Sequence, residues 1–147
     1  MQWPYLLFAV VAGAMIPFQA GINAQLAHWV GGPIRAALVS FLVGTFALLL
    51  IAAAQRKSLP SIGRIGDAPW WVWIGGLLGA FYVAGSIVSA PKLGAATLTA
   101  AVVAGQSLTS LLVDRFGWVG FKEHPLSAGR ALGMVLVAGG VALVRFF

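Results

Sequence analysis

Charged residues are scarce in this chain of 147 residues. Asp, Glu, Lys and Arg together make up 8% of it, whereas soluble domains carry about 25%. Hydrophobic residues make up 61%, and the mean hydropathy is +0.97. A soluble fold would have too few polar side chains to cover its surface. The composition therefore predicts an all-α integral membrane protein that is surrounded by membrane lipid.

Cysteine is absent and acidic residues number only three. The chain can therefore form no disulfide and no thiolate metal site. It also contains no HExxH motif, no Gly-x-Ser-x-Gly elbow and no phosphate-binding loop. We expect no enzyme, no cofactor and no metal. The formal net charge of +6 does not indicate a nucleic-acid partner, because the bases lie between apolar runs, where membrane topology accounts for them.

Five apolar runs are each long enough, at 1.5 Å per residue, to cross a bilayer as a helix. The Gly-Gly-Pro sequence at residues 31–33 follows the first run, Pro91 separates the third from the fourth, and Pro125 precedes the fifth. Pro17 alone lies inside a run, where it predicts a kink. All six tryptophans fall at or just beyond run ends, as in an aromatic belt. We predict one transmembrane domain over residues 1–147, with helices at about residues 3–29, 34–55, 70–90, 93–113 and 126–147.

The basic residues are divided unevenly between the two sides of this arrangement. Three lie opposite the amino terminus (Arg35, Lys92 and Arg145), and six lie on its side (Arg56, Lys57, Arg64, Arg115, Lys122 and Arg130). This bias favours a cytoplasmic amino terminus, and five spans then place the carboxyl terminus outside. Because the bias is modest, insertion of the same sequence in both orientations is an open alternative.

Polar side chains within the apolar runs are few, and each needs a hydrogen-bond partner or water. They fall on one face of the first, third and fourth predicted helices. If these faces converge, they surround an uncharged, hydrogen-bonding cavity that suits a small-molecule substrate. The alternative is that serine hydroxyls bond to their own helix. The predicted substrate-binding residues are Gln19, Asn23, Tyr82, Ser86, Gln106 and Ser110.

Two further features have a structural and a functional interpretation. Asp114 ends the fourth predicted helix, where a carboxylate either forms a gate or coupling site or pairs with a nearby base. Small residues at four-residue spacing permit close helix contacts in lipid. The glycines predicted to pack in this way are Gly44, Gly75, Gly79, Gly105, Gly129 and Gly133.

Five segments resemble the YdcZ-type half-size proteins of the drug/metabolite transporter superfamily. They are QAGINAQL, ALVSFLVGT, GGLLGAFYV, PKLGAATLTAAVVAGQSLTSLLVDRFG and RALGMVLVAGGVAL, which begin at residues 19, 37, 75, 91 and 130. The similarity covers nearly the whole chain. It implies a five-helix half-transporter of the bacterial inner membrane, paired with an inverted second copy or a homologous half to reproduce a ten-helix transporter.

The resemblance also bears on the substrate. The small multidrug resistance branch of this superfamily binds cations with a glutamate in its first helix, whereas this chain has Gln19 and Asn23 there and no carboxylate. A small polar or zwitterionic metabolite, moved by alternating access with the substrate near the midplane, fits this pattern best. The alternatives are a small dual-topology ion channel and a non-transporting accessory subunit.

Overall fold

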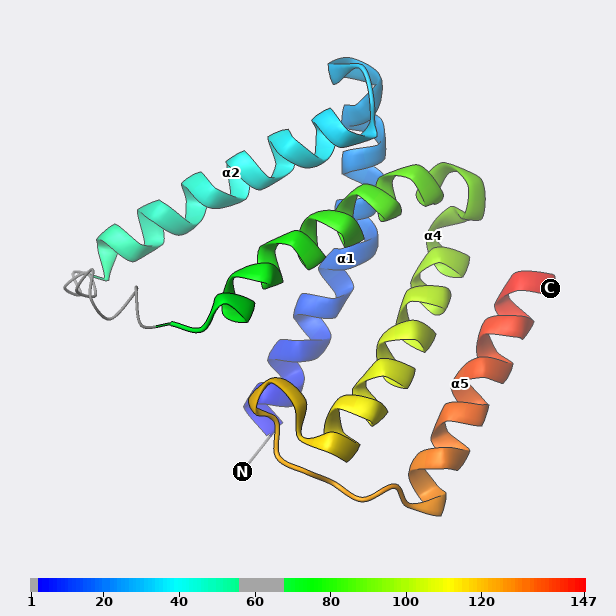
Figure 1. Cartoon of the computed structure of the whole chain (residues 1–147). Coiled ribbons are helices and arrows are strands. Elements are labelled where there is room, and N and C mark those ends of the chain that lie inside the picture. Colours follow the sequence, from blue (N-terminus) through cyan, green and yellow to red (C-terminus); the bar gives the residue numbers. More distant parts are fainter. Residues whose placement is uncertain (1–2, 56–67) are drawn as a thin grey trace. The chain divides into compact units, whose positions relative to one another are not determined.

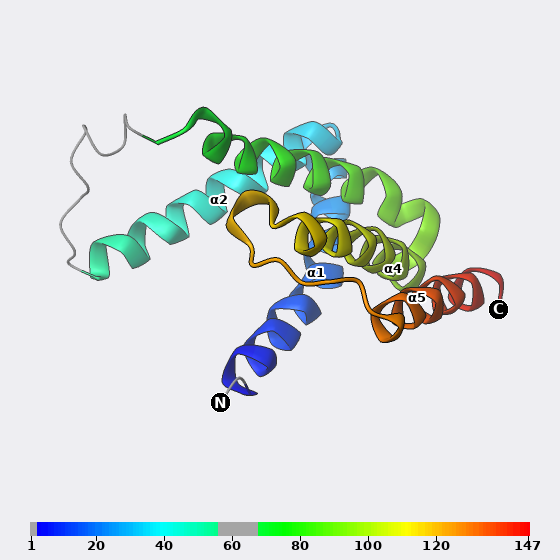
Figure 2. The ribbon, with the colours of Figure 1, turned by 60° about the horizontal axis from the view of Figure 1, so that its bottom comes forward.

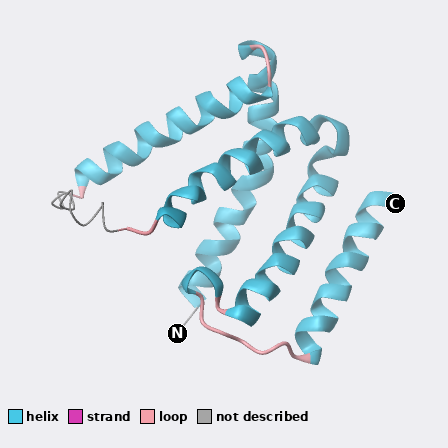
Figure 3. Ribbon diagram, viewed as in Figure 1, coloured by secondary structure: helices cyan, strands magenta, loops and turns pink. Residues whose placement is uncertain are grey.

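The computed structural model describes residues 3–55 and 68–147, and this part of the chain contains helices and loops but no strand (Figure 3). Three of the predicted loop bases, Arg56, Lys57 and Arg64, lie outside the described residues. The elements in chain order are α1 (Trp3–Val30), α2 (Pro33–Ala54), the 3₁₀ turn η1 (Trp70–Ile74), α4 (Gly75–Phe116), the 3₁₀ turn η2 (Trp118–Gly120) and α5 (Ala128–Phe146) (Figure 1).

The turn between α1 and α2 follows directly from its sequence. Gly31 and Gly32 have φ angles of 79° and 142°, which residues other than glycine rarely adopt. Pro33 then begins α2, a position where its missing N–H costs no helical hydrogen bond. Arg35 folds back over this turn, and its Nη1 donates to the carbonyl oxygen of Val30 at 3.4 Å. A two-residue connection therefore joins two long apolar helices.

Within the described residues, four helical segments rather than five are long and apolar enough to cross a membrane. The third and fourth predicted spans belong to one element, α4, whose 42 residues correspond to about 63 Å. The expected separation at Pro91 is wrong, because α4 continues through that proline. The helix is interrupted instead at Gly94, with φ 75° and ψ 165°. Proline removes one helical hydrogen bond and crowds the preceding turn, but its own φ stays helical, whereas glycine readily adopts the positive φ found at residue 94.

The chain divides into two compact units, Phe18–Pro91 and a second formed by Met1–Pro17 with Lys92–Phe147. Both boundaries fall at a proline inside a helix, Pro17 in α1 and Pro91 in α4. The single transmembrane domain stays a prediction.

The unit Phe18–Pro91 has a small core where the end of α1, the start of α2 and the first half of α4 meet. Figures 1 and 2 show α2, in cyan, beside that part of α4, in green. Small side chains allow the close backbone approach on which helix association in lipid depends. The core consists of Ala36, Ala37, Val83 and Ile87, with Leu26, Ala27, Val30, Tyr82 and Ala84 packed against it.

The apolar side chains of α2 mostly lie outside this core. Leu48, Leu49 and Leu50 have 57–67% of their surface exposed, and they point in different directions around the helix. In water such a surface would drive aggregation, whereas in a bilayer the acyl chains cover it. The exposure therefore agrees with a helix that is surrounded by lipid over much of its circumference.

In the other unit, the connection between α4 and α5 is held by polar contacts. The carboxylate Oδ2 of Asp114 and the guanidinium Nη2 of Arg130 form a 3.2 Å ion pair. The backbone N–H of His124 donates to the carbonyl oxygen of Asp114 at 2.8 Å. Ser127 caps α5, because its Oγ accepts from the backbone N–H of Arg130. These contacts fix the end of α4 to the beginning of α5.

Candidate functional site

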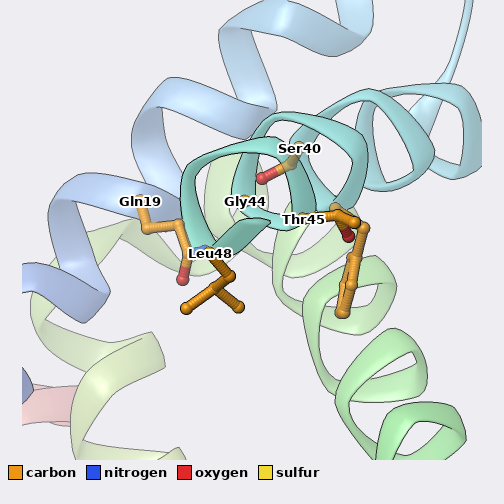
Figure 4. A pocket seen from close by; sticks show the side chains of 6 residues that line it. Gln19, Ser40, Gly44, Thr45 and Leu48 are labelled. Carbon is orange, nitrogen blue, oxygen red and sulfur yellow. The ribbon is translucent and has the colours of Figure 1, made fainter. Parts of the chain in front are cut away.

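A pocket of about 230 Å³ lies between α1 and α2 within the unit Phe18–Pro91. Figure 4 shows Gln19 approaching from α1, while the other labelled residues come from α2. Its polar lining is neutral, namely one carboxamide and two hydroxyl groups, and its apolar lining includes an aromatic ring. The residues that line it are Gln19, Ser40, Phe41, Gly44, Thr45 and Leu48.

The helical repeat explains why these α2 residues meet. Ser40, Gly44 and Leu48 recur every four positions and so lie above one another on one face, while Phe41 and Thr45 form the adjacent row. Gly44 leaves this face open, since a Cβ built on it would meet no other atom within 4 Å. Gly44 also falls near the middle of α2. If α2 crosses the bilayer, the pocket is therefore near its midplane.

Asn23 lies one turn beyond Gln19 on α1, and its environment is different. Only 4% of its surface is exposed, and its Nδ2 has no hydrogen-bond partner among the described residues. Most buried polar atoms in folded proteins are hydrogen-bonded, so each exception needs a physical explanation. A bound ligand, an ordered water or a second subunit would each provide an acceptor for this amide.

Two other predicted site residues belong to the same unit. Ser86 on α4 is 7% exposed, and Tyr82 packs against the small core. Gln19, Asn23, Tyr82 and Ser86 therefore all come from the part of the chain that contains the pocket, but of these four only Gln19 lines it.

The remaining predicted site residues, Gln106 and Ser110, belong to the other unit and are exposed. The Oγ of Ser110 donates to the carbonyl oxygen of Ser107, three residues earlier, at 2.9 Å. This is the bond to its own helix that was the alternative to a cavity role. It uses the only donor of the Ser110 hydroxyl and leaves that oxygen as an acceptor.

Asp114, the predicted gate or coupling residue, is 27% exposed on its side chain and is paired with Arg130, whose side chain is 36% exposed. The partner is thus a base at the start of α5 and not the adjacent Arg115. The pair joins two consecutive helices and lies outside the unit that contains the pocket.

The predicted packing glycines differ in their surroundings. A Cβ on Gly79 would lie 3.6 Å from Cζ of Phe41, so the backbone of α4 approaches an aromatic ring of α2. A Cβ on Gly129 would meet only Ser127 Oγ, at 4.0 Å. The glycines at which an added Cβ would meet nothing within 4 Å are Gly44, Gly75, Gly105 and Gly133. A packing role for these four requires contacts beyond those of the described chain.

The sequence does not predict the α2 side of the pocket. Ser40 and Gly44 are small residues at four-residue spacing, a pattern that predicts a packing face, and Phe41 and Thr45 carry no motif. The signal was the pair of hydroxyls at mid-helix depth beside a glycine. No group of three or more His, Cys, Asp or Glu side chains suited to a metal occurs in residues 3–55 and 68–147.

Comparison with known proteins agrees with the resemblance described above. Residues 4–143 match the family described as "Putative inner membrane exporter, YdcZ". The chain is also 31% identical over 144 residues to "Inner membrane protein YdcZ" of Escherichia coli strain K12, an alignment that covers 95% of this chain and 93% of the relative. No solved structure matches the chain. The family match and the apolar helices together identify a multi-pass protein of the inner membrane.

Proposed function

The chain belongs to the YdcZ family of inner membrane proteins, and on that premise we propose that it is half of a small-molecule transporter. Two copies, or this chain and a homologous half, assemble in opposite orientations and work by alternating access. The substrate site includes Gln19, Asn23, Tyr82 and Ser86, which all belong to the unit Phe18–Pro91. A contribution from Gln106 and Ser110, which belong to the other unit, stays a prediction.

The observation that carries this proposal is the buried Asn23 amide. Its Nδ2 has no partner among the described residues, although only 4% of the surface of the residue is exposed. In an apolar environment an unpaired N–H donor lowers the stability of the protein, and a ligand that accepts a hydrogen bond from it removes this cost. The neutral pocket one helical turn away, with Gln19 in its wall, places hydrogen-bonding groups near the middle of α1 and α2.

The inverted arrangement depends on α4 crossing the membrane twice. At about 63 Å its 42 residues are twice as long as the ~30 Å hydrocarbon core requires. Gly94, with its non-helical backbone, divides it into two segments of about twenty residues each. Five crossings put the two chain ends on opposite sides, and an inverted partner then supplies the other half of a two-fold repeat.

Two cysteines in one chain distinguish five crossings from four. Gln55 and Lys122 are exposed in loops, and the natural sequence has no cysteine that would interfere. With five crossings both positions lie on the same side, whereas with four they lie on opposite sides. In sealed vesicles treated with a membrane-impermeant maleimide, we expect each Gln55→Cys/Lys122→Cys chain to carry two labels or none. A population of singly labelled chains would refute the five-crossing topology.

The same experiment reports orientation. If subunits insert both ways, doubly labelled and unlabelled chains appear in comparable amounts. If all chains carry two labels, or if none carries a label, the subunits have a single orientation. Transport itself is tested with purified protein in proteoliposomes. Saturable counterflow of a solute supports the transporter, steady ionic current without counterflow would indicate a channel, and neither activity would indicate an accessory subunit.

A further inference from the structure

Three polar side chains that line the pocket between α1 and α2 are available to hydrogen-bond a ligand. Within the described chain no hydrogen bond engages the side chains of Gln19, Ser40 or Thr45. The carboxamide and the two hydroxyls can each donate and accept. The other walls are apolar, formed by the ring of Phe41 and by Leu48. A ligand that fits this lining has a donor and acceptor at one end and an apolar portion at the other.

Charge is absent from the pocket and from most of both helices. Arg35 is the only Lys, Arg, Asp or Glu within α1 and α2, and its guanidinium is engaged with Val30 at the turn that joins them. Gly44 lies nine residues further along α2, about 13 Å along the axis. A charged ligand would therefore lose its hydration near the middle of the span without a counter-charge.

The ring of Phe41, which forms the aromatic wall of the pocket, lies against α4. A Cβ on Gly79 would lie 3.6 Å from Cζ and 3.9 Å from Cε1 of Phe41, so the ring is backed by the α4 backbone. The pocket volume of about 230 Å³ is below the roughly 300–1,000 Å³ of sites that hold drug-sized ligands. The ligand is accordingly small, of about the size of a single substituted ring.

We propose that this pocket is a binding site for a small uncharged molecule, with Gln19, Ser40 and Thr45 as its hydrogen-bond partners and Phe41 and Leu48 as its apolar contacts. The proposal rests on the transporter function and narrows its substrate to uncharged compounds. It also assigns a selectivity role to α2, which the sequence marks only as a packing helix.

The test uses three one-ring probes that differ in charge: benzamide, benzoate and benzylammonium. Binding to the purified full-length protein in nanodiscs is measured by equilibrium titration, with empty nanodiscs as the partition control. We expect benzamide to bind saturably and the two ions to bind roughly a hundredfold more weakly, because neither finds a counter-charge. Equal binding of either ion, or no saturable binding of benzamide, would overturn the uncharged class.

A pair of glycine variants tests the location. Gly44→Val fills the pocket, whereas Gly85→Val adds the same side chain to α4, outside the pocket lining. At both positions a Cβ meets no atom within 4 Å, so both chains should fold. We expect Gly44→Val to weaken benzamide binding at least tenfold and Gly85→Val to leave it unchanged. Equal affinity of Gly44→Val and wild type would overturn the site.

These results separate the pocket from the transporter function. If the cysteine labelling and counterflow support a transporter while Gly44→Val binds benzamide normally, the pocket assignment fails alone. If benzamide binding follows the glycine variants but no flux is found, the pocket stands and the transporter proposal fails. Lipid is the other possible occupant: if benzamide fails to bind while an acyl chain is found in the pocket, the small-ligand proposal is overturned.

Discussion

Replacement of Asn23 with leucine tests whether its amide is unpaired. Asn23 is 4% exposed, and its Nδ2 has no partner among the described residues. An unsatisfied buried donor costs about 1–3 kcal/mol, and leucine is close to asparagine in size. We therefore expect Asn23→Leu to raise the free energy of unfolding by about 1–3 kcal/mol. For a chain of this length, each kcal/mol corresponds to about 2–4 °C in Tm.

Thermal unfolding of the purified protein in a neutral detergent, followed by tryptophan fluorescence, measures the change. Gln25→Leu is the matched control, because Gln25 is on the same helix but exposed. It should change the unfolding free energy by no more than about 0.5 kcal/mol. The comparison separates removal of a buried unpaired donor from the general effect of making α1 more apolar.

Ligand-induced stabilisation gives Asn23→Leu a second readout. A ligand at a hundred times its Kd stabilises the folded state by about 2.7 kcal/mol. If Asn23 contacts the substrate, the variant should be more stable than wild type without ligand and gain little when ligand is added. A loss of more than about 1 kcal/mol without ligand would refute the reasoning, because it would mean that the amide is already hydrogen-bonded in the folded protein.

Three further predictions concern the second unit and α4. A double-mutant cycle with Asp114→Asn and Arg130→Gln should give a coupling energy of about 1 kcal/mol that falls in 1 M salt, since the 3.2 Å pair is partly exposed; zero coupling in the unfolding assay would contradict it. Gly117→Ala should lower the unfolding free energy by about 1–2 kcal/mol, because Gly117 has φ 61° and an added Cβ would lie 2.8 Å from Cγ of Glu123; an unchanged Tm would count against this. Gly94→Ala should lower the unfolding free energy by about 1–3 kcal/mol, because φ 75° with ψ 165° is accessible almost only to glycine. In the two-cysteine labelling experiment, any reduction of the doubly labelled fraction would link Gly94 to the double crossing of α4.

Composition and chain breakers were enough to predict the membrane class and the first turn. An apolar run followed by Gly-Gly-Pro leaves few backbone solutions, and the structure places left-handed glycines and an N-terminal proline there. The interruption of α4 was harder to locate. Pro91 and Gly94 are both helix breakers within four residues, and the sequence does not reveal which of them departs from helical geometry.

Contacts between residues that are far apart in the sequence could not be predicted from sequence patterns. Asp114 has Arg115 beside it, yet its carboxylate pairs with Arg130 across the turn between α4 and α5. Similarly, the Ser40–Gly44 repeat on α2 is equally compatible with a neighbouring helix and with an empty pocket. Side-chain spacing fixes which residues share a face, but the element opposite that face is set by tertiary packing.

The distribution of charge along the helices links the pocket to the proposed function. The charged groups of the described helices lie towards their ends or in the turns that join them, as Arg35, Asp114 and Arg130 illustrate, except for Lys92, which lies two residues before the interruption of α4 at Gly94. The polar groups nearer the middle of α1 and α2, including Gln19, are neutral, and each can donate and accept. A site with these groups can hydrogen-bond a solute without an ionised side chain at the membrane centre, where a charge is most costly. Selectivity for uncharged ligands therefore needs no additional residues. It follows from the absence of charged side chains at the membrane centre, which also permits the helices to cross the bilayer.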